Sequence, residues 1–167
     1  MADNDNISEM QPTTYNLLFV CTGNSCRSPL AEAIARREIA ERGWSHVAVA
    51  SAGVAAAAGT PASDGAIQAA KEQGIDLAPH RSQPLTPQLI EWADLILAMS
   101  TSHQSAVAEL GGAEKSALVT DFLEGAGMGQ AIEDPFGSDL DAYRRTFKQL
   151  ERAIMSLMAR LEPILSP

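Results

Sequence analysis

The chain has 167 residues and is acidic, because 21 Asp and Glu residues oppose 12 Lys and Arg residues for a formal net charge of −9. This charge excludes a nucleic-acid-binding surface, which needs clustered basic side chains, and a polybasic membrane patch. Hydrophobic residues make up 46% of the sequence, as expected of a globular domain with a sizeable core, and no apolar run approaches the roughly 20 residues that span a bilayer.

The N-terminal segment, residues 1–13, is polar and acidic and lacks the apolar stretch of a signal peptide. We expect it to be a disordered tail, followed by a single domain over residues 14–167. The sequence holds two cysteines, Cys21 and Cys26, whereas a secreted disulfide scaffold would carry more of them along its length. These features predict a cytoplasmic protein that binds neither nucleic acid nor membrane, and they leave the oligomeric state open.

The first predicted elements are a strand and a helix joined by a short polar loop. Tyr15–Val20 is a continuous apolar run, typical of a strand buried on both faces. The loop Cys21–Ser28 follows it. Ser28 suits the N-cap of the next helix, Pro29 its first helical position and Gly43 its end.

The middle of the chain alternates between short apolar runs and helical patterns. Further strands are predicted at His46–Ser51, Asp94–Met99 and Ala117–Thr120, and helices at Ser63–Gln73, from Pro87 onward and at Thr101–Leu110. This alternation predicts an α/β fold, a single doubly wound domain with a parallel sheet and helices on both faces. Ligands bind beyond the carboxyl ends of the strands in such folds, which is where the loop Cys21–Ser28 lies.

The C-terminal third begins with a glycine-rich stretch, residues 124–137, which we expect to be a mobile surface loop. The clearest amphipathic helix follows, with apolar residues at three- and four-residue steps from Leu140 to Leu161. Asp139 and Asp141 suit the start of this helix, where carboxylates complement the helix dipole. The two tryptophans, Trp44 and Trp92, are expected to be packing residues.

The loop Cys21–Ser28 has the sequence CTGNSCRS, which meets the requirements of a bound phosphate dianion. A short loop that wraps into a helix start directs several N–H groups at one point. Gly23 and Asn24 tolerate the unusual backbone angles of such a loop, and Arg27 can grip two phosphoryl oxygens with its planar fork. The predicted phosphate-binding residues are Thr22, Gly23, Asn24, Ser25, Cys26 and Ser28.

Cys21 lies at the centre of this positive concavity. The amide groups and the helix terminus that bind phosphate also stabilise a thiolate, and the Ser28 hydroxyl can donate a hydrogen bond to the sulfur. Phosphoryl transfer to sulfur needs a proton donor for the leaving group. Asp134, followed by Pro135 at the end of the glycine-rich stretch, is the best candidate, and its carboxylate can then activate water. The pattern predicts catalysis by Cys21, Arg27 and Asp134.

The segment CTGNSCRSPLAE, with Asp134-Pro135 far downstream, resembles the low-molecular-weight protein tyrosine phosphatase family over residues 15–163. The resemblance implies a four-stranded parallel sheet, the same three catalytic residues, and a phosphorylated protein as substrate. It also implies that Asn24, Ser28 and His80 form a polar network that holds the loop. No metal or other cofactor is implied, and the two cysteines and three scattered histidines do not suggest a metal site.

The residues around the loop depart from the tyrosine-specific pattern of this family. The tyrosine-specific members resemble one another in having bulky apolar residues at the positions that Thr22 and Ser25 occupy here. They also have two aromatic residues after Asp-Pro, whereas this chain has the single Phe136 followed by glycine. CTGN-Ser25-CRSP with DPFG resembles the protein arginine phosphatase branch instead. Phe136 can stack on a phenol ring or on a guanidinium, so phosphotyrosine and phosphoarginine both remain candidate substrates.

Two other functions are compatible with a phosphate-binding loop of this kind. The loop also resembles that of thioredoxin-linked arsenate reductases, but their reaction needs further cysteines, and none follows Cys26 in this chain. A catalytically silent phosphate-binding module would lack the nucleophile, the arginine or the acid, and all three are present. Cys26 can pack in the core or form a reversible disulfide with Cys21. His46 and His103 are assigned no role.

Overall fold

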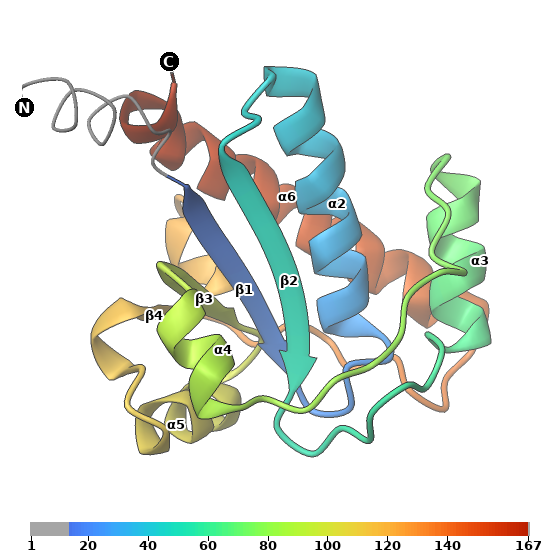
Figure 1. The fold of residues 1–167 in the computed structure, drawn as a ribbon. Coiled ribbons are helices and arrows are strands. Elements are labelled where there is room, and N and C mark those ends of the chain that lie inside the picture. The colour runs from blue at the N-terminus through green and yellow to red at the C-terminus, as the bar shows by residue number, and fades with distance from the viewer. Residues whose placement is uncertain (1–13, 167) are drawn as a thin grey trace, which may run out of the picture.

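The computed structural model describes residues 14–166, so the predicted tail over residues 1–13 lies outside the described residues. Four parallel strands form one sheet in the order β2-β1-β3-β4 (Figure 1). Their bounds are β1 Tyr15–Cys21, β2 Val47–Gly53, β3 Leu95–Ala98 and β4 Ser116–Leu118. The predicted four-stranded parallel sheet of an α/β domain is confirmed.

Helices follow the strands along the chain, as a parallel sheet requires. The α-helices are α2 Arg27–Arg42, α3 Asp64–Glu72, α4 Pro87–Trp92, α5 Thr101–Glu109 and α6 Leu140–Leu165, and the 3-10 helices are η1 Ala113–Lys115 and η2 Val119–Phe122. On one face α2, α3 and α6 share a core cluster with β1, whereas α4 and α5 pack against the other face (Figure 1). The predicted doubly wound arrangement is therefore present.

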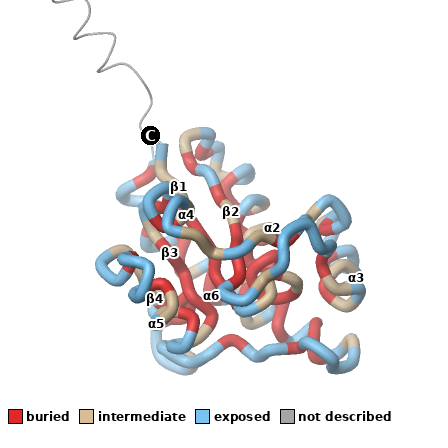
Figure 2. Tube along the Cα trace, turned by 60° about the horizontal axis from the view of Figure 1, so that its bottom comes forward, coloured by how far each residue is buried: buried red, intermediate tan, exposed pale blue. Residues whose placement is uncertain are grey.

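The strand β1 is buried on both faces at the centre of the molecule. Leu17 and Phe19 belong to the core beneath α2 and α6, and Leu18 and Val20 belong to the core beneath α4 and α5. All four side chains are completely buried, which explains why this strand has a continuous apolar run and no alternation of apolar with polar residues. Figure 2 shows the strands as the buried centre of the fold, with exposed surface along the outer helices.

The long C-terminal helix α6 confirms the amphipathic pattern in the sequence. Its buried side chains include Tyr143, Phe147, Leu150, Ile154, Leu157, Met158 and Leu161. The Asp139 carboxylate accepts a hydrogen bond of 3.0 Å from the backbone N–H of Ala142 and so caps the helix. None of the helices in the described part of the chain is long and apolar enough to cross a membrane.

Two local predictions were wrong. Helix α2 begins at Arg27 with Cys26 as its N-cap, because the Ser28 side chain is used elsewhere in the loop. The fourth strand ends at Leu118, since the Asp121 carboxylate accepts from the Leu118 N–H at 2.9 Å and bends the chain into η2. Of the two tryptophans, Trp44 is buried, and Trp92 ends the short helix α4 and is 36% exposed.

Candidate active site

The loop between β1 and α2 lies beyond the carboxyl ends of β1 and β2, at the lower end of the sheet in Figure 1. It surrounds one side of a cavity of about 180 Å³. The cavity is lined by residues from this loop and by two residues from the segment before α6, namely Cys21, Thr22, Gly23, Ser25, Cys26, Arg27, Asp134 and Phe136. Of the residues predicted to act on the phosphoryl group, to bind it or to contact the substrate, all but Asn24 and Ser28 line the cavity. Ser28 contacts the Cys21 sulfur, and Asn24 contacts Ser28. His80, predicted as part of the network that holds the loop, contacts the Asn24 carbonyl.

The tight curvature of the loop depends on two residues. Asn24 has a φ of 53°, in the left-handed region that its short polar side chain tolerates. Gly23 does not have a positive φ, so of Gly23 and Asn24 it is Asn24 that takes the left-handed conformation. The essential glycine is Gly53 at the end of β2, where a Cβ atom would lie 2.5 Å from the Thr22 carbonyl oxygen and 2.8 Å from the Asn24 nitrogen.

The Cys21 sulfur is buried at the base of the loop, 2.8 Å from the Ser28 hydroxyl oxygen. The Asn24 side-chain amide donates a hydrogen bond of 2.8 Å to the same hydroxyl oxygen. Because this amide occupies an acceptor position on Ser28, the Ser28 proton can be donated to the sulfur, which is nearer than its other acceptor, the Ala52 carbonyl at 3.5 Å. The arrangement suits a thiolate, which accepts hydrogen bonds.

The Asn24 side chain is held in place from behind by several groups. Its amide also donates to the Ser51 hydroxyl at 2.9 Å, and Ser51 donates to the Glu32 carboxylate at 2.6 Å. Its side-chain oxygen accepts from the Gln83 N–H at 3.0 Å, and its backbone carbonyl lies 2.9 Å from His80 Nε2, which donates to it. The structure thus brings Asn24, Ser28 and His80 into one network.

Three members of that network were not predicted. Glu32 ends the segment CTGNSCRSPLAE and Ser51 ends the strand predicted at His46–Ser51, so both stand in segments that the sequence indicates without giving these two residues a role. Gln83 contributes its backbone N–H, which any residue except proline possesses. The contact of residue 83 with Asn24 therefore could not be predicted from the type of residue at that position.

Arg27 extends across the cavity and is 7% exposed. Its Nη1 donates to the Ile132 carbonyl at 3.3 Å, and its Nη2 lies 3.5 Å from the Thr22 hydroxyl. The same Nη2 lies 3.5 Å from the Asp134 carboxylate. The guanidinium is thus directed toward the cavity by three groups from two distant parts of the chain.

Asp134 and Phe136 lie at the mouth of the cavity. The Asp134 side chain is 54% exposed, and its Oδ1 accepts a hydrogen bond of 3.1 Å from the Phe136 N–H. Phe136 is 71% exposed, so its ring is available to a bound molecule. Two residues before Asp134, the buried Ile132 anchors the segment through a hydrogen bond of 2.9 Å to the Met99 carbonyl.

Cys26 is a free, buried thiol, as is Cys21. Its sulfur lies 3.1 Å from the Ser63 hydroxyl and 3.7 Å from the Tyr143 hydroxyl. Burial raises the pKa of Tyr143, which keeps its proton available for donation. The tyrosine ring can lie here because residue 65 is glycine, since a Cβ there would be 2.3 Å from the ring.

His103 is a further residue of the site to which the sequence assigned no role. It comes from α5, is 3% exposed, and its Nε2 lies 2.8 Å from the Thr22 hydroxyl. Burial, together with the positive charge of Arg27, lowers the pKa of His103 to about 4, against the opposing effect of Asp134. The ring is therefore neutral near neutral pH.

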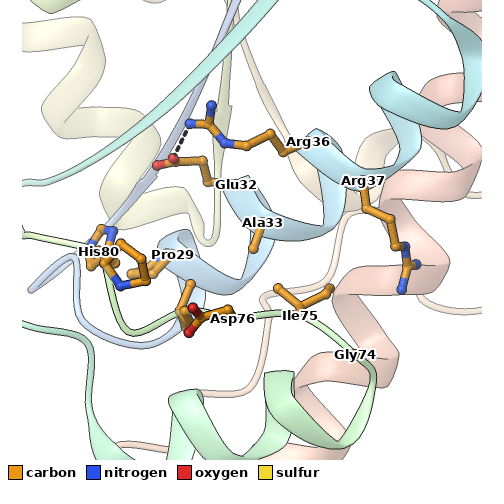
Figure 3. Close-up of a pocket in the computed structure, with 11 residues that line it drawn as sticks. Pro29, Glu32, Ala33, Arg36, Arg37, Gly74, Ile75, Asp76 and His80 are labelled. Carbon is orange, nitrogen blue, oxygen red and sulfur yellow. Dashed lines mark hydrogen bonds and ion pairs between the residues drawn. The ribbon is translucent and has the colours of Figure 1, made fainter.

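A larger hollow of about 580 Å³ lies on the other side of the loop, between α2 and the segment that follows α3. Figure 3 shows the Glu32 carboxylate paired with Arg36, and His80 beside the start of α2. The hollow is lined by no cysteine, serine or threonine. We assign the chemistry to the smaller cavity because it contains a buried thiol, a guanidinium and a carboxylate.

A parallel α/β sheet whose first strand ends in a buried cysteine, followed by a helix with an inward-facing arginine, defines the class of cysteine-dependent phosphatases. Among residues 14–166, no group of three or more His, Cys, Asp or Glu side chains is placed to hold a metal ion. Comparison with known proteins identifies the family within this class.

The family model for low molecular weight phosphotyrosine protein phosphatase matches residues 16–164. A protein-arginine-phosphatase from Bacillus subtilis is 40% identical over 147 residues, which cover 88% of this chain and 97% of that protein. The chain belongs to the low molecular weight phosphotyrosine protein phosphatase family, which confirms the resemblance found in the sequence.

Solved structures agree with this assignment. A low molecular weight protein tyrosine phosphatase from T. tengcongensis has a TM-score of 0.82 and 36% identity, covering 89% of this chain and 100% of that one. The YwlE arginine phosphatase, solved as a cysteine-to-serine mutant with a phosphorylated active-site serine, has a TM-score of 0.80 and 39% identity, covering 88% of this chain and 95% of that one.

Proposed function

We propose that this protein is a cysteine-dependent phosphoprotein phosphatase in which Cys21 attacks the phosphorus atom, and that phosphoarginine is its preferred substrate. The observation that carries the catalytic assignment is the contact of 2.8 Å between the Cys21 sulfur and the Ser28 hydroxyl at the base of the cavity. A hydroxyl that donates to the sulfur stabilises the thiolate, which is the nucleophilic form of cysteine.

In the first step the Cys21 sulfur forms a bond to phosphorus, and the bond from phosphorus to the leaving nitrogen or oxygen breaks. The backbone amides of the loop and the Arg27 guanidinium stabilise the equatorial phosphoryl oxygens. Protonated Asp134 gives its proton to the leaving group. The position of Asp134 at the cavity mouth, 3.5 Å from Arg27, supports this role.

In the second step a water molecule attacks the phosphorus atom of the phosphocysteine. The Asp134 carboxylate takes the proton of this water, the bond from phosphorus to sulfur breaks, and Cys21 leaves as a thiolate. The products are inorganic phosphate and the enzyme in its starting form. The phosphorylated active-site serine of the YwlE mutant supports an intermediate on the corresponding side chain.

Two features support phosphoarginine. The relative that shares 40% identity over 88% of this chain is named a protein-arginine-phosphatase. The cavity walls beside the phosphorus position carry the hydroxyls of Thr22 and Ser25, and hydroxyl groups can hydrogen-bond to the N–H groups of a guanidinium. A flat phenyl ring would find one exposed aromatic residue, Phe136.

Phosphotyrosine is the second candidate, because Phe136 is 71% exposed at the cavity mouth and can stack on a phenol ring. Relatives named as tyrosine phosphatases include one from Escherichia coli with 35% identity over 150 residues. For either substrate we propose the reducing cytoplasm as the site of action, since a disulfide between Cys21 and Cys26 would block the nucleophile.

The test is the release of phosphate from two peptides of the same sequence, one with phosphoarginine and one with phosphotyrosine, under reducing conditions. We expect kcat/KM to favour phosphoarginine by at least about tenfold, a difference of about 1.4 kcal/mol. Cys21→Ser is the control and should release no phosphate while still binding it. A preference for phosphotyrosine would contradict the substrate assignment, and turnover by Cys21→Ser would contradict the nucleophile.

A lack of release from both peptides by a folded protein would contradict the whole proposal. A catalytically silent phosphate-binding module would then be the better description. Inorganic phosphate binding, measured by calorimetry on the same sample, would show whether the loop is intact. Arsenate reduction coupled to thioredoxin would be measured in parallel, and we expect none, because no cysteine follows Cys26 in the sequence.

A further inference from the structure

His103 has no part in the chemical steps described above, yet both of its ring nitrogens are engaged. Nε2 lies 2.8 Å from the Thr22 hydroxyl, 81 residues earlier in the chain, and Nδ1 lies 2.8 Å from the Ser100 hydroxyl. The ring is 3% exposed at the first turn of α5. A buried imidazole with a hydroxyl partner on each nitrogen cannot rotate without losing a hydrogen bond.

Burial and the positive charge of Arg27 keep this ring neutral, and the negative charge of Asp134 opposes them. The positive charge of Arg27 acts on it from the cavity side, and the negative charge of Asp134 acts from the segment before α6. A neutral imidazole has one donor nitrogen and one acceptor nitrogen, so each of the two hydroxyls has a defined partner.

Thr22 follows Cys21 directly and lines the cavity. Its hydroxyl lies 3.5 Å from Arg27 Nη2, the nitrogen that is also 3.5 Å from the Asp134 carboxylate. A threonine side chain can place either its hydroxyl or its methyl group at a given point, depending on χ1. The contact with His103 selects the rotamer that places the hydroxyl beside the guanidinium.

We propose that His103 is a positioning residue that acts through Thr22: it holds the Thr22 hydroxyl beside Arg27, so that the guanidinium and the hydroxyl together face the phosphoryl oxygens. This inference rests on the proposed function, because it assumes that a phosphoryl group occupies the cavity. A series of hydrogen bonds connects Ser100, at the N-cap of α5, to His103, then to Thr22 and finally to Arg27.

The alternative is that His103 is only a buried polar residue that stabilises the start of α5 through Ser100. The positioning role and the purely structural role predict different results in a double-mutant cycle of His103 and Thr22. Thr22→Val removes the hydroxyl and keeps the shape of the side chain, and His103→Leu removes the ring. If His103 acts through the Thr22 hydroxyl, its loss has no further effect once that hydroxyl is absent.

We would measure kcat/KM for p-nitrophenyl phosphate in the wild type, the two single variants and the double variant. Each single variant should lose about tenfold, the effect of one hydrogen bond. The kcat/KM of the double variant should be no lower than that of the less active single variant. Losses that multiply to about a hundredfold, or a folded His103→Leu variant with full activity, would overturn the proposal. His46→Leu, a matched change outside the site, should retain wild-type activity.

A second measurement needs no change at His103 and so does not depend on the folding of that variant. Nitrogen-15 NMR of the histidine side chains would follow the wild type during a titration with inorganic phosphate. We expect the Nε2 resonance of His103 to shift, and the shift to be largely lost in Thr22→Val. An unchanged His103 resonance at saturating phosphate would overturn the proposal.

The double-mutant cycle and the NMR titration also distinguish a failure of this inference from a failure of the proposed function. If the wild type binds phosphate but hydrolyses no phosphomonoester or phosphoramidate, the proposed function fails. The NMR titration would still show whether His103 responds to the phosphate site through Thr22. If hydrolysis is intact and the cycle is multiplicative, the proposed function stands and the positioning role fails.

Discussion

Arg27 Nη2 lies 3.5 Å from both the Thr22 hydroxyl and the Asp134 carboxylate, so these two groups flank the same guanidinium nitrogen. They differ in charge and in what holds them. The Asp134 carboxylate is 54% exposed at the cavity mouth, whereas the neutral Thr22 hydroxyl is 2.8 Å from the buried His103 ring. At the scale of single residues, the carboxylate is suited to proton transfer and the hydroxyl held by His103 is suited to orientation.

The role of Asp134 can be tested by varying the leaving group. Asp134→Ala should lower kcat by about 10²-fold or more for a phosphotyrosine peptide, whose phenolate is a poor leaving group. The loss should be much smaller for p-nitrophenyl phosphate, whose leaving group needs no proton. Steady-state kinetics with both substrates would check this. Equal losses would show that Asp134 does not act as the acid.

Gly53 offers a test of the loop geometry. In Gly53→Ala the new Cβ would overlap the backbone of Thr22 and Asn24, at 2.5 and 2.8 Å, and backbone atoms cannot move aside as a flexible side chain can. We expect the affinity for inorganic phosphate, measured as competitive inhibition, to fall at least about tenfold.

Ala48→Ser is a suitable control for this variant, because Ala48 is an exposed residue of the same strand β2. It should retain the phosphate affinity of the wild type. Wild-type phosphate affinity in folded Gly53→Ala would show that the loop tolerates a side chain at this contact.

At the scale of elements, the parts with a strong local pattern could be predicted. β1 has a continuous apolar run, and α6 has a long apolar stripe, so neither depends on distant residues for its signal. The three-residue strand β4 is too short to show periodicity, and its end depends on a hydrogen bond from Leu118 to Asp121.

The same distinction applies to the site. Cys21, Arg27 and Ser28 lie within eight residues, and their spacing alone indicates phosphate chemistry. The contact of His103 with Thr22 joins residues 81 apart, and a single histidine on a short helix has no pattern of its own. Such contacts follow from the packing of α5 against β3 and β4 and could not be derived from local sequence.

The start of α6 allows a prediction about stability. Asp139→Ala removes the hydrogen bond to the Ala142 N–H and should lower the free energy of unfolding by about 1 kcal/mol. Urea unfolding at pH 7 would measure the change. Asp141→Ala serves as the control, because this side chain pairs with Arg144 on the surface and should contribute less. Equal losses in the two variants would contradict a capping role for Asp139.

At the scale of the whole molecule, His103 makes stability depend on pH. Its pKa is about 4 in the folded protein and 6.5 as the ordinary value. The unfolded chain therefore binds a proton more readily between these values, so folding stability is fully present above pH 6.5 and falls as the pH drops toward 4. The shift corresponds to a loss on the order of 3 kcal/mol.

Urea unfolding from pH 7 to pH 4 would check this effect in the wild type and in His103→Leu. Carboxylates also contribute to the pH dependence of stability between pH 7 and pH 4, but they do so equally in the wild type and in the variant. We expect the stability of the wild type to fall more steeply than that of the variant. Parallel curves would show that His103 is not held neutral by the fold.

The groups of the site come from five separate stretches of the chain, namely the loop after β1, the end of β2, the segment after α3, the start of α5 and the segment before α6. The site is complete only when all five stretches have reached their places in the fold. Recovery of turnover after dilution from denaturant should therefore coincide with the last step of refolding. Helical signal alone could return earlier, since α2 and α6 have their own local patterns.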